Sequence, residues 1–117
     1  MHEASVTEAL VKIAVEEAVK SKAVKVESLS LVVGETTGYM AESLEFYFKS
    51  FAKDTILEGA VLHIEYVKPR LRCASCDSLF ERKQFSFDCP KCGMPGEMTS
   101  VGSEFYIDTM NIVKEDQ

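Results

Sequence analysis

A chain of 117 residues with 46% apolar content can support one modest hydrophobic core, and a formal net charge of -6 argues against general nucleic-acid binding, because phosphate contacts need a basic surface. No apolar stretch approaches the length of a membrane span, and the first residues lack the basic start and apolar run of a signal peptide. We therefore expect a cytoplasmic protein with no membrane and no nucleic-acid partner. That compartment is reducing, which favours metal thiolates over disulfides.

The first predicted element is a helix. Ser5 and Glu8 have the spacing of a capping box, which predicts that the helix begins at Ser5 and runs to about Ser21. Residues 1–3 would then form a short arm in front of it. The stripe expected to face the core is Val6, Leu10, Ile13 and Ala14, followed by Glu17 or Ala18.

A strand and a second helix follow. Residues 25–33 are rich in β-branched and apolar side chains, which predicts a strand with a bulge near Ser28, and Gly34 ends it. After a loop, apolar and aromatic residues recur at helical spacing: Met40, Leu44, Tyr47, Phe48 and Phe51. We interpret this stripe as core packing and not as a cofactor-binding surface.

The remaining elements complete an α+β fold. Residues 60–67 alternate, with Leu62, Ile64 and Tyr66 predicted to face the core and His63 to face solvent, and 104–113 is the last strand. Two helices on one face of a three-stranded sheet form a two-layer domain with an inserted, zinc-ribbon-like lobe that contains four cysteines. The predicted division is 1–68 and 98–117 for the α+β domain and 69–97 for the lobe.

The lobe contains all the cysteines of the chain, in two Cys-x-x-Cys knuckles. Their spacing matches a tetrahedral metal site with four thiolate ligands, and structural zinc is the first candidate. Iron in a rubredoxin-like site is a competitor that spacing alone does not exclude, whereas disulfides and two independent redox pairs fit the pattern less well. The predicted ligands are Cys73, Cys76, Cys89 and Cys92.

A second candidate site lies at Met1-His2-Glu3. The α-amine, the backbone nitrogen of His2 and its imidazole Nδ1 can chelate one ion in a plane, which suits Ni(II) or Cu(II). The fourth position is then open to a carboxylate such as Glu3, to water or to a partner protein. No nucleophile–base pair or phosphate-binding loop is visible, so we do not expect an enzyme.

Met1-His2-Glu3 before a helix, Val32-Val33-Gly34-Glu35 at the end of the first strand, and paired cysteine knuckles before the last strand together resemble the hydrogenase nickel-incorporation family, HypA/HybF. The resemblance covers essentially the whole chain. It implies a nickel metallochaperone for [NiFe] hydrogenase maturation, and in some bacteria for urease.

By the same resemblance, His2 is the principal nickel ligand with Glu3 beside it, and the four cysteines hold structural zinc. The implied partners are the accessory GTPase HypB and the hydrogenase large-subunit precursor. Some members have an acidic nickel ligand at the start of the second helix, where this chain has Ala41 followed by Glu42. The alternative functions are a rubredoxin-like electron carrier and a zinc-ribbon interaction module. The sequence leaves open whether the protein is a monomer or a homodimer.

Overall fold

The computed structural model describes residues 3–82 and 86–115, and the chain divides into two compact units. The first lies within Met1–Val32, Tyr39–Glu65 and Tyr106–Gln117. The second lies within Val33–Gly38 and Tyr66–Phe105. Each unit has a core of its own, and the second carries the cysteines.

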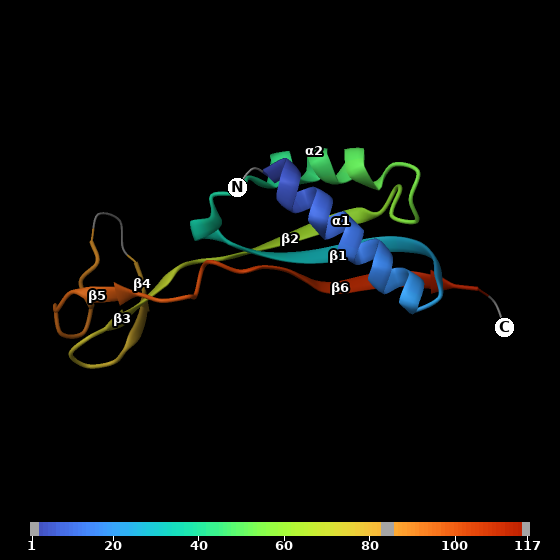
Figure 1. Ribbon diagram of the computed structural model, residues 1–117. Coiled ribbons are helices and arrows are strands. Elements are labelled where there is room, and N and C mark those ends of the chain that lie inside the picture. Colours follow the sequence, from blue (N-terminus) through green and yellow to red (C-terminus); the bar gives the residue numbers. More distant parts are fainter. Residues whose placement is uncertain (1–2, 83–85, 116–117) are drawn as a thin grey trace. The chain divides into compact units, whose positions relative to one another are not determined.

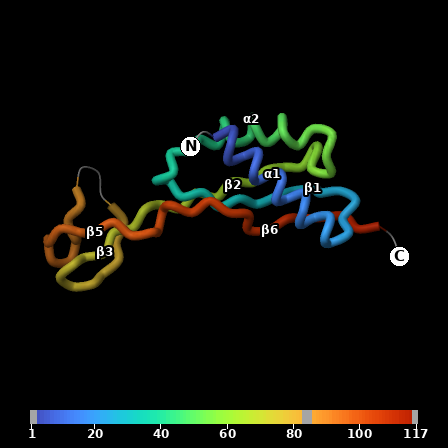
Figure 2. Tube along the Cα trace, in the orientation of Figure 1, coloured from blue at the N-terminus to red at the C-terminus, as the bar shows by residue number. Residues whose placement is uncertain are grey.

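In the first unit, two α-helices cover one face of a three-stranded sheet (Figure 1). The bounds are α1 Glu3–Lys20, β1 Ala23–Gly34, α2 Ala41–Ala52, β2 Val61–Val67 and β6 Phe105–Lys114. The strand order is β2-β1-β6, with β1 central. In Figures 1 and 2, β1 and β2 run in the same direction and α2 connects them, as parallel neighbours require. The predicted fold class is confirmed.

The core of this unit lies between the helices and β1. Because β1 is the central strand and lies under the helices, it supplies more fully buried side chains than either edge strand. Val26 and Leu29 are both 0% exposed, so burial changes phase between them, in the segment where the sequence predicts a bulge. The other fully buried or nearly buried residues include Leu10, Ala14, Ala18, Leu31, Leu44, Phe48, Ala52 and Leu57.

Several sequence predictions for these elements are wrong in detail. The capping box does not form, because α1 already includes Glu3, an acid favoured at the positive end of a helix, and Ser5 lies inside the first turn. Ile13 is 52% exposed, and Val11 takes its place in the buried stripe. Met40 precedes α2 and is 63% exposed. Tyr66, predicted to face the core, is 40% exposed and lies where the chain enters the second unit.

The second unit has its own antiparallel sheet, which confirms the zinc-ribbon-like lobe of the predicted fold. Its strands are β3 Arg70–Cys73, β4 Leu79–Glu81 and β5 Gly96–Met98, in the order β4-β3-β5. Leu71 pairs with Phe80 on one side and with Met98 on the other. The buried cluster is small and consists of Leu71, Phe80 and two of the cysteines.

The end of β1 and the short 3-10 helix η1 (Glu35–Thr37) also belong to this unit. The amide of Gly34 donates to Glu104 O at 2.7 Å, and the amide of Thr36 donates to Gly102 O at 2.8 Å. A β-carbon at Gly34 would lie 1.9 Å from Gly102 O, so only glycine fits there. The backbones of residues 34–36 and 102–104, which are far apart in the sequence, therefore lie in direct contact.

Candidate metal centre

The two cysteine knuckles have the same backbone geometry. Asp77 N donates to Cys73 O at 2.9 Å, and Gly93 N donates to Cys89 O at 2.8 Å. The residue after each second cysteine is left-handed, with φ of 59° at Asp77 and 75° at Gly93. The amide two or three residues after each first cysteine points at its sulfur, Cys76 N to Cys73 and Lys91 N to Cys89, both at 3.4 Å. Each knuckle thus turns both of its sulfurs toward one point.

The four sulfurs form one cluster. Their Sγ atoms all lie within 4.8 Å of one another, with Cys73 and Cys92 at 3.2 Å and Cys76 and Cys89 at 3.7 Å. With zinc–sulfur bonds of about 2.3 Å, the four sulfurs of a tetrahedral site lie about 3.8 Å apart. The four thiols therefore fit a single metal ion with four thiolate ligands. Within the described residues this is the one such group of cysteine, histidine or acidic side chains. The structure therefore brings together all four predicted cysteines.

The cluster lies at the surface of the lobe. In each knuckle the first cysteine is buried, Cys73 at 1% and Cys89 at 3%, while Cys76 and Cys92 are exposed. The buried pair packs against the small apolar core, and the exposed pair closes the site toward solvent. A bound ion would therefore cross-link a lobe whose own core is too small to hold it together.

Hydrogen bonds in and around the cluster shift the pKa values of Cys73, Cys76 and Cys92. A backbone hydrogen bond from Cys76 lowers the pKa of Cys73, and hydrogen bonds with the side chain and then the backbone of Ser78 lower the pKa of Cys76 to about 6. The backbone of Met94 lowers the pKa of Cys92, but the neighbouring thiols, Cys73 first, and desolvation outweigh it and raise that pKa to about 12. Thiolate forms readily at one sulfur of the cluster and at high cost at another, as expected for donors close enough to share one ion.

The surface of the lobe carries both acidic and basic side chains. Arg72 Nε lies 3.5 Å from Asp77 Oδ1, and both side chains are mostly exposed. Across the sheet, Arg70 faces Glu81 and Arg72 faces Glu97. Two of the basic residues on β3 are therefore paired across the sheet with acids.

The structure describes some of the predicted nickel-site residues and not others. His2 lies outside the described residues. Glu3 is in the first turn of α1, and its Oε2 accepts a hydrogen bond from the backbone amide of Met40 at 2.9 Å. Ala41 is the first residue of α2, and Glu42 follows it as the acid of the first turn. His63 is exposed on β2, as the sequence predicts.

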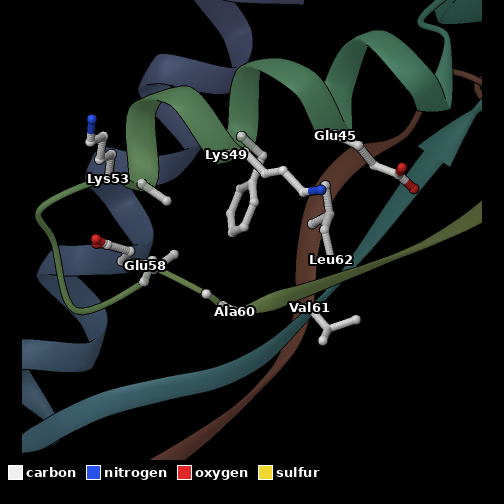
Figure 3. Close-up of a pocket in the computed structure, with 11 residues that line it drawn as sticks. Glu45, Lys49, Lys53, Glu58, Ala60, Val61 and Leu62 are labelled. Carbon is white, nitrogen blue, oxygen red and sulfur yellow. The ribbon is translucent and has the colours of Figure 1, made fainter.

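A groove of about 540 Å³ lies beside α2 in the first unit (Figure 3). Apolar side chains such as Phe48 and Leu62 line it, and Glu45, Lys49 and Lys53 lie at its rim. No cysteine or histidine is among the described residues that line it. Among the described residues, the groove therefore brings no cysteine or histidine ligand to a metal ion.

Four contacts of the candidate sites are not predicted from the sequence. Ser78 Oγ lies 3.3 Å from Cys76 Sγ, and the backbone oxygen of Ser78 accepts a hydrogen bond from Cys73 N. The one feature of the sequence that could indicate these contacts is the position of Ser78 five residues after Cys73. Met94 accepts from Cys89 N in the equivalent place of the second knuckle. The partner of Glu3, the Met40 amide, leaves no trace in the sequence, since backbone amides are present everywhere.

Comparisons with known proteins agree along the whole chain. Residues 1–112 match the family described as "HypA: Hydrogenase/urease nickel incorporation, metallochaperone". A hydrogenase maturation factor HypA of Caldanaerobacter subterraneus subsp. tengcongensis is 43% identical over 113 residues, which cover 96% of this chain and 99% of that protein. The HypA of Methanocaldococcus jannaschii is 35% identical, covering 99% of this chain and all of its own.

Solved structures agree as well. The solution structure of the nickel metallochaperone HypA from Helicobacter pylori has a TM-score of 0.68 and 26% identity, and covers 98% of this chain and 100% of its own. A second HypA solution structure has a TM-score of 0.74 at the same identity and covers 98% of both chains. Among the described helices, none is long and apolar enough to cross a membrane.

Proposed function

This chain belongs to the HypA family of hydrogenase/urease nickel-incorporation metallochaperones, and we propose that it binds Ni(II) at its N-terminus and delivers it during [NiFe] hydrogenase maturation. The observation that carries the proposal is the match to this family from residue 1 onward, which includes Met1-His2-Glu3. Relatives named as maturation factors and as a nickel metallochaperone imply a carrier and not a catalyst.

The four cysteines, in this proposal, hold structural Zn(II). The support is the donor set, four thiols clustered at tetrahedral distances by two matching knuckles. Zinc bound there supplies a redox-inert cross-link and no chemistry on a substrate. We propose this lobe, 69–97, as the zinc-binding part of the protein and 1–68 with 98–117 as the nickel-binding part.

Nickel is the cargo and moves by ligand exchange. The amine of Met1, the backbone nitrogen of His2 and its imidazole form a planar donor set, and the fourth position stays available. The sequence prediction places Glu3 beside this position. An incoming donor from the recipient then occupies it while the protein still holds the ion, so nickel is not released free into water.

Binding through these nitrogens displaces protons. The amine and the imidazole must lose theirs, so nickel affinity should rise as pH rises from about 6 to about 8. Calorimetric titration at several pH values measures this directly. An affinity that is flat over the range would contradict terminal nitrogen ligation.

The recipients follow from the family role. We propose that the protein works in the cytoplasm with the accessory GTPase HypB and with the hydrogenase large-subunit precursor. The description of the family also includes urease as a destination. Each partner is testable by co-purification with and without nickel, using the zinc-loaded protein.

The central experiment is elemental analysis of wild type and His2→Ala, before and after one equivalent of Ni(II) is added. We expect one zinc in both proteins and nickel retained only by wild type. Equal nickel in both proteins would remove His2 as a ligand. Iron in the thiolate site, visible by its colour, would favour the rubredoxin-like electron carrier instead.

A further inference from the structure

The start of α2 is stabilised by a side chain from another helix. Met40 is the N-cap residue of α2, and its own side chain makes no capping hydrogen bond. Its carbonyl accepts from Leu44 N at 3.0 Å, the first hydrogen bond of the helix. Its amide donates to Glu3 Oε2 at 2.9 Å. Glu3 therefore satisfies a backbone group that the local sequence does not.

This arrangement replaces one half of a capping box. In a capping box, an acid or amide three residues into the helix accepts from the N-cap amide. In α2 that position is Ser43, a residue too short for this role, and the carboxylate comes instead from α1. The negative charge also lies at the positive end of the α2 dipole, which strengthens the contact. Figure 2 shows that both helices begin at the same end of the first unit.

We propose that Glu3 is a positioning residue for nickel binding and not a nickel ligand. Its carboxylate anchors the first turn of α1 to the start of α2, and consecutive residues are only about 3.8 Å apart, so the chain leading to His2 departs from a fixed point. The proposal rests on the proposed function, because it concerns the same nickel site.

Anchoring has a consequence for the fourth nickel position. Oε2 is held by the Met40 amide, and releasing it would leave that group of α2 without its partner. The carboxylate is thereby fixed at the start of α2, and in this proposal the fourth nickel position is taken by water or by a donor of the recipient. A donor that arrives with the recipient makes transfer depend on contact with it.

The test uses three variants of the full zinc-loaded chain. Glu3→Gln keeps an oxygen that accepts from Met40 N but replaces the carboxylate by a poor nickel ligand. Glu3→Ala removes both functions. Glu16→Ala removes an exposed acid from the same helix and controls for the change in charge. Each protein is examined by amide hydrogen exchange without nickel and by titration with Ni(II).

If Glu3 positions the site, Glu3→Gln keeps most of the protection of the Met40 amide, because its neutral oxygen still accepts that hydrogen bond, and it shows the same nickel absorption spectrum and an affinity within about twofold. Glu3→Ala loses the protection, and its nickel affinity falls about three- to tenfold, the range expected for loss of a charge-assisted capping bond. Glu16→Ala behaves like wild type.

Two results would overturn the proposal. A Glu3→Gln protein that keeps Met40 protection but loses nickel affinity or changes its spectrum would show that the carboxylate is a ligand. Equal Met40 exchange in wild type and Glu3→Ala would show that no anchor exists. The exchange measurement needs no nickel, so if wild type fails to bind Ni(II), the proposed function fails while the anchor is still decided.

Discussion

The two candidate metal regions of this protein are built in opposite ways. In the second unit, all four donors come from two short knuckles whose turns repeat the same hydrogen bonds and leave no open position. At the other region, the one described candidate ligand, Glu3, is already engaged by a backbone amide. A site that holds its metal permanently is complete without a partner, whereas a site that passes its metal on must leave room for one.

Removing one thiolate should have the largest effect. Cys89→Ser takes a buried ligand from the cluster, so the lobe should lose zinc and unfold, because structural zinc sites of this size contribute on the order of 10 kcal/mol to folding. The first unit has a separate apolar core and should stay folded. Zinc analysis and an amide NMR spectrum measure both effects. If the zinc-free variant keeps the NMR signals of β3, β4 and β5, the lobe does not need its metal to fold.

Acidification should release zinc before it unfolds the first unit. Metal binding requires thiolates, and protons compete more strongly as pH falls, above all for Cys92, whose pKa is raised to about 12. Cys76, with a pKa of about 6, is the thiol that gives up its proton most readily. Zinc affinity should therefore fall steadily from about pH 8 to about pH 5. A chromogenic chelator measures the released zinc, and circular dichroism monitors the helices. Simultaneous loss of both signals would show that the units are not independent.

The sequence predicts the two sites to very different extents. The cysteine cluster follows from spacing alone, because each Cys-x-x-Cys pair closes its own turn within a few residues and the donors need no distant partner. The contact of Glu3 with Met40 joins residues far apart in the chain through a backbone amide, which has no residue type to recognise. The same reason explains the failed capping box: Ser5 and Glu8 fit the local rule, but α1 already includes Glu3, which also contacts the start of α2.

The elements themselves are well predicted wherever periodicity decides them. The core positions Leu10, Leu44 and Phe48 are buried as their helical spacing indicates. The errors fall at edges, where Ile13 and Met40 lie outside the buried face although both are apolar. Sequence patterns show which side of a helix is apolar, but only the packed neighbours decide how far that side is covered.

A substitution at Gly34, where the backbone contacts Gly102, should have an intermediate effect on the stability of the second unit. Gly34→Ala places a β-carbon 1.9 Å from Gly102 O, a backbone atom that cannot move aside, so this unit should lose about 2–4 kcal/mol of stability. Gly38→Ala is the matched control in the same unit, since φ is 75° there but no atom lies within 4 Å of the added carbon, and it should cost about 1 kcal/mol. Thermal unfolding of both zinc-loaded variants compares them. Equal losses would mean that the close approach of Gly34 to Gly102 O does not restrict this position to glycine.

The smallest expected effect is a gain of stability in the first unit. Thr7 is 1% exposed, and its hydroxyl has no hydrogen-bond partner among the described residues. Thr7→Val keeps the branched shape and removes an unsatisfied polar atom, which should raise stability by about 1 kcal/mol. Thr55→Val is the opposite case, because Thr55 Oγ1 donates to Ala52 O at 2.6 Å and accepts from Leu57 N at 3.1 Å, so its loss should destabilise.

Both threonine variants should show their shifts in thermal unfolding with zinc and also after chelation, because the stability of the first unit comes from apolar packing and not from metal. If the Thr7→Val gain disappears when zinc is removed, the two units share one folding transition. The first unit would then also depend on the metal, and not on apolar packing alone. If the gain persists, the first unit, which carries the proposed nickel ligands, stays folded whether or not the cysteine cluster holds its ion.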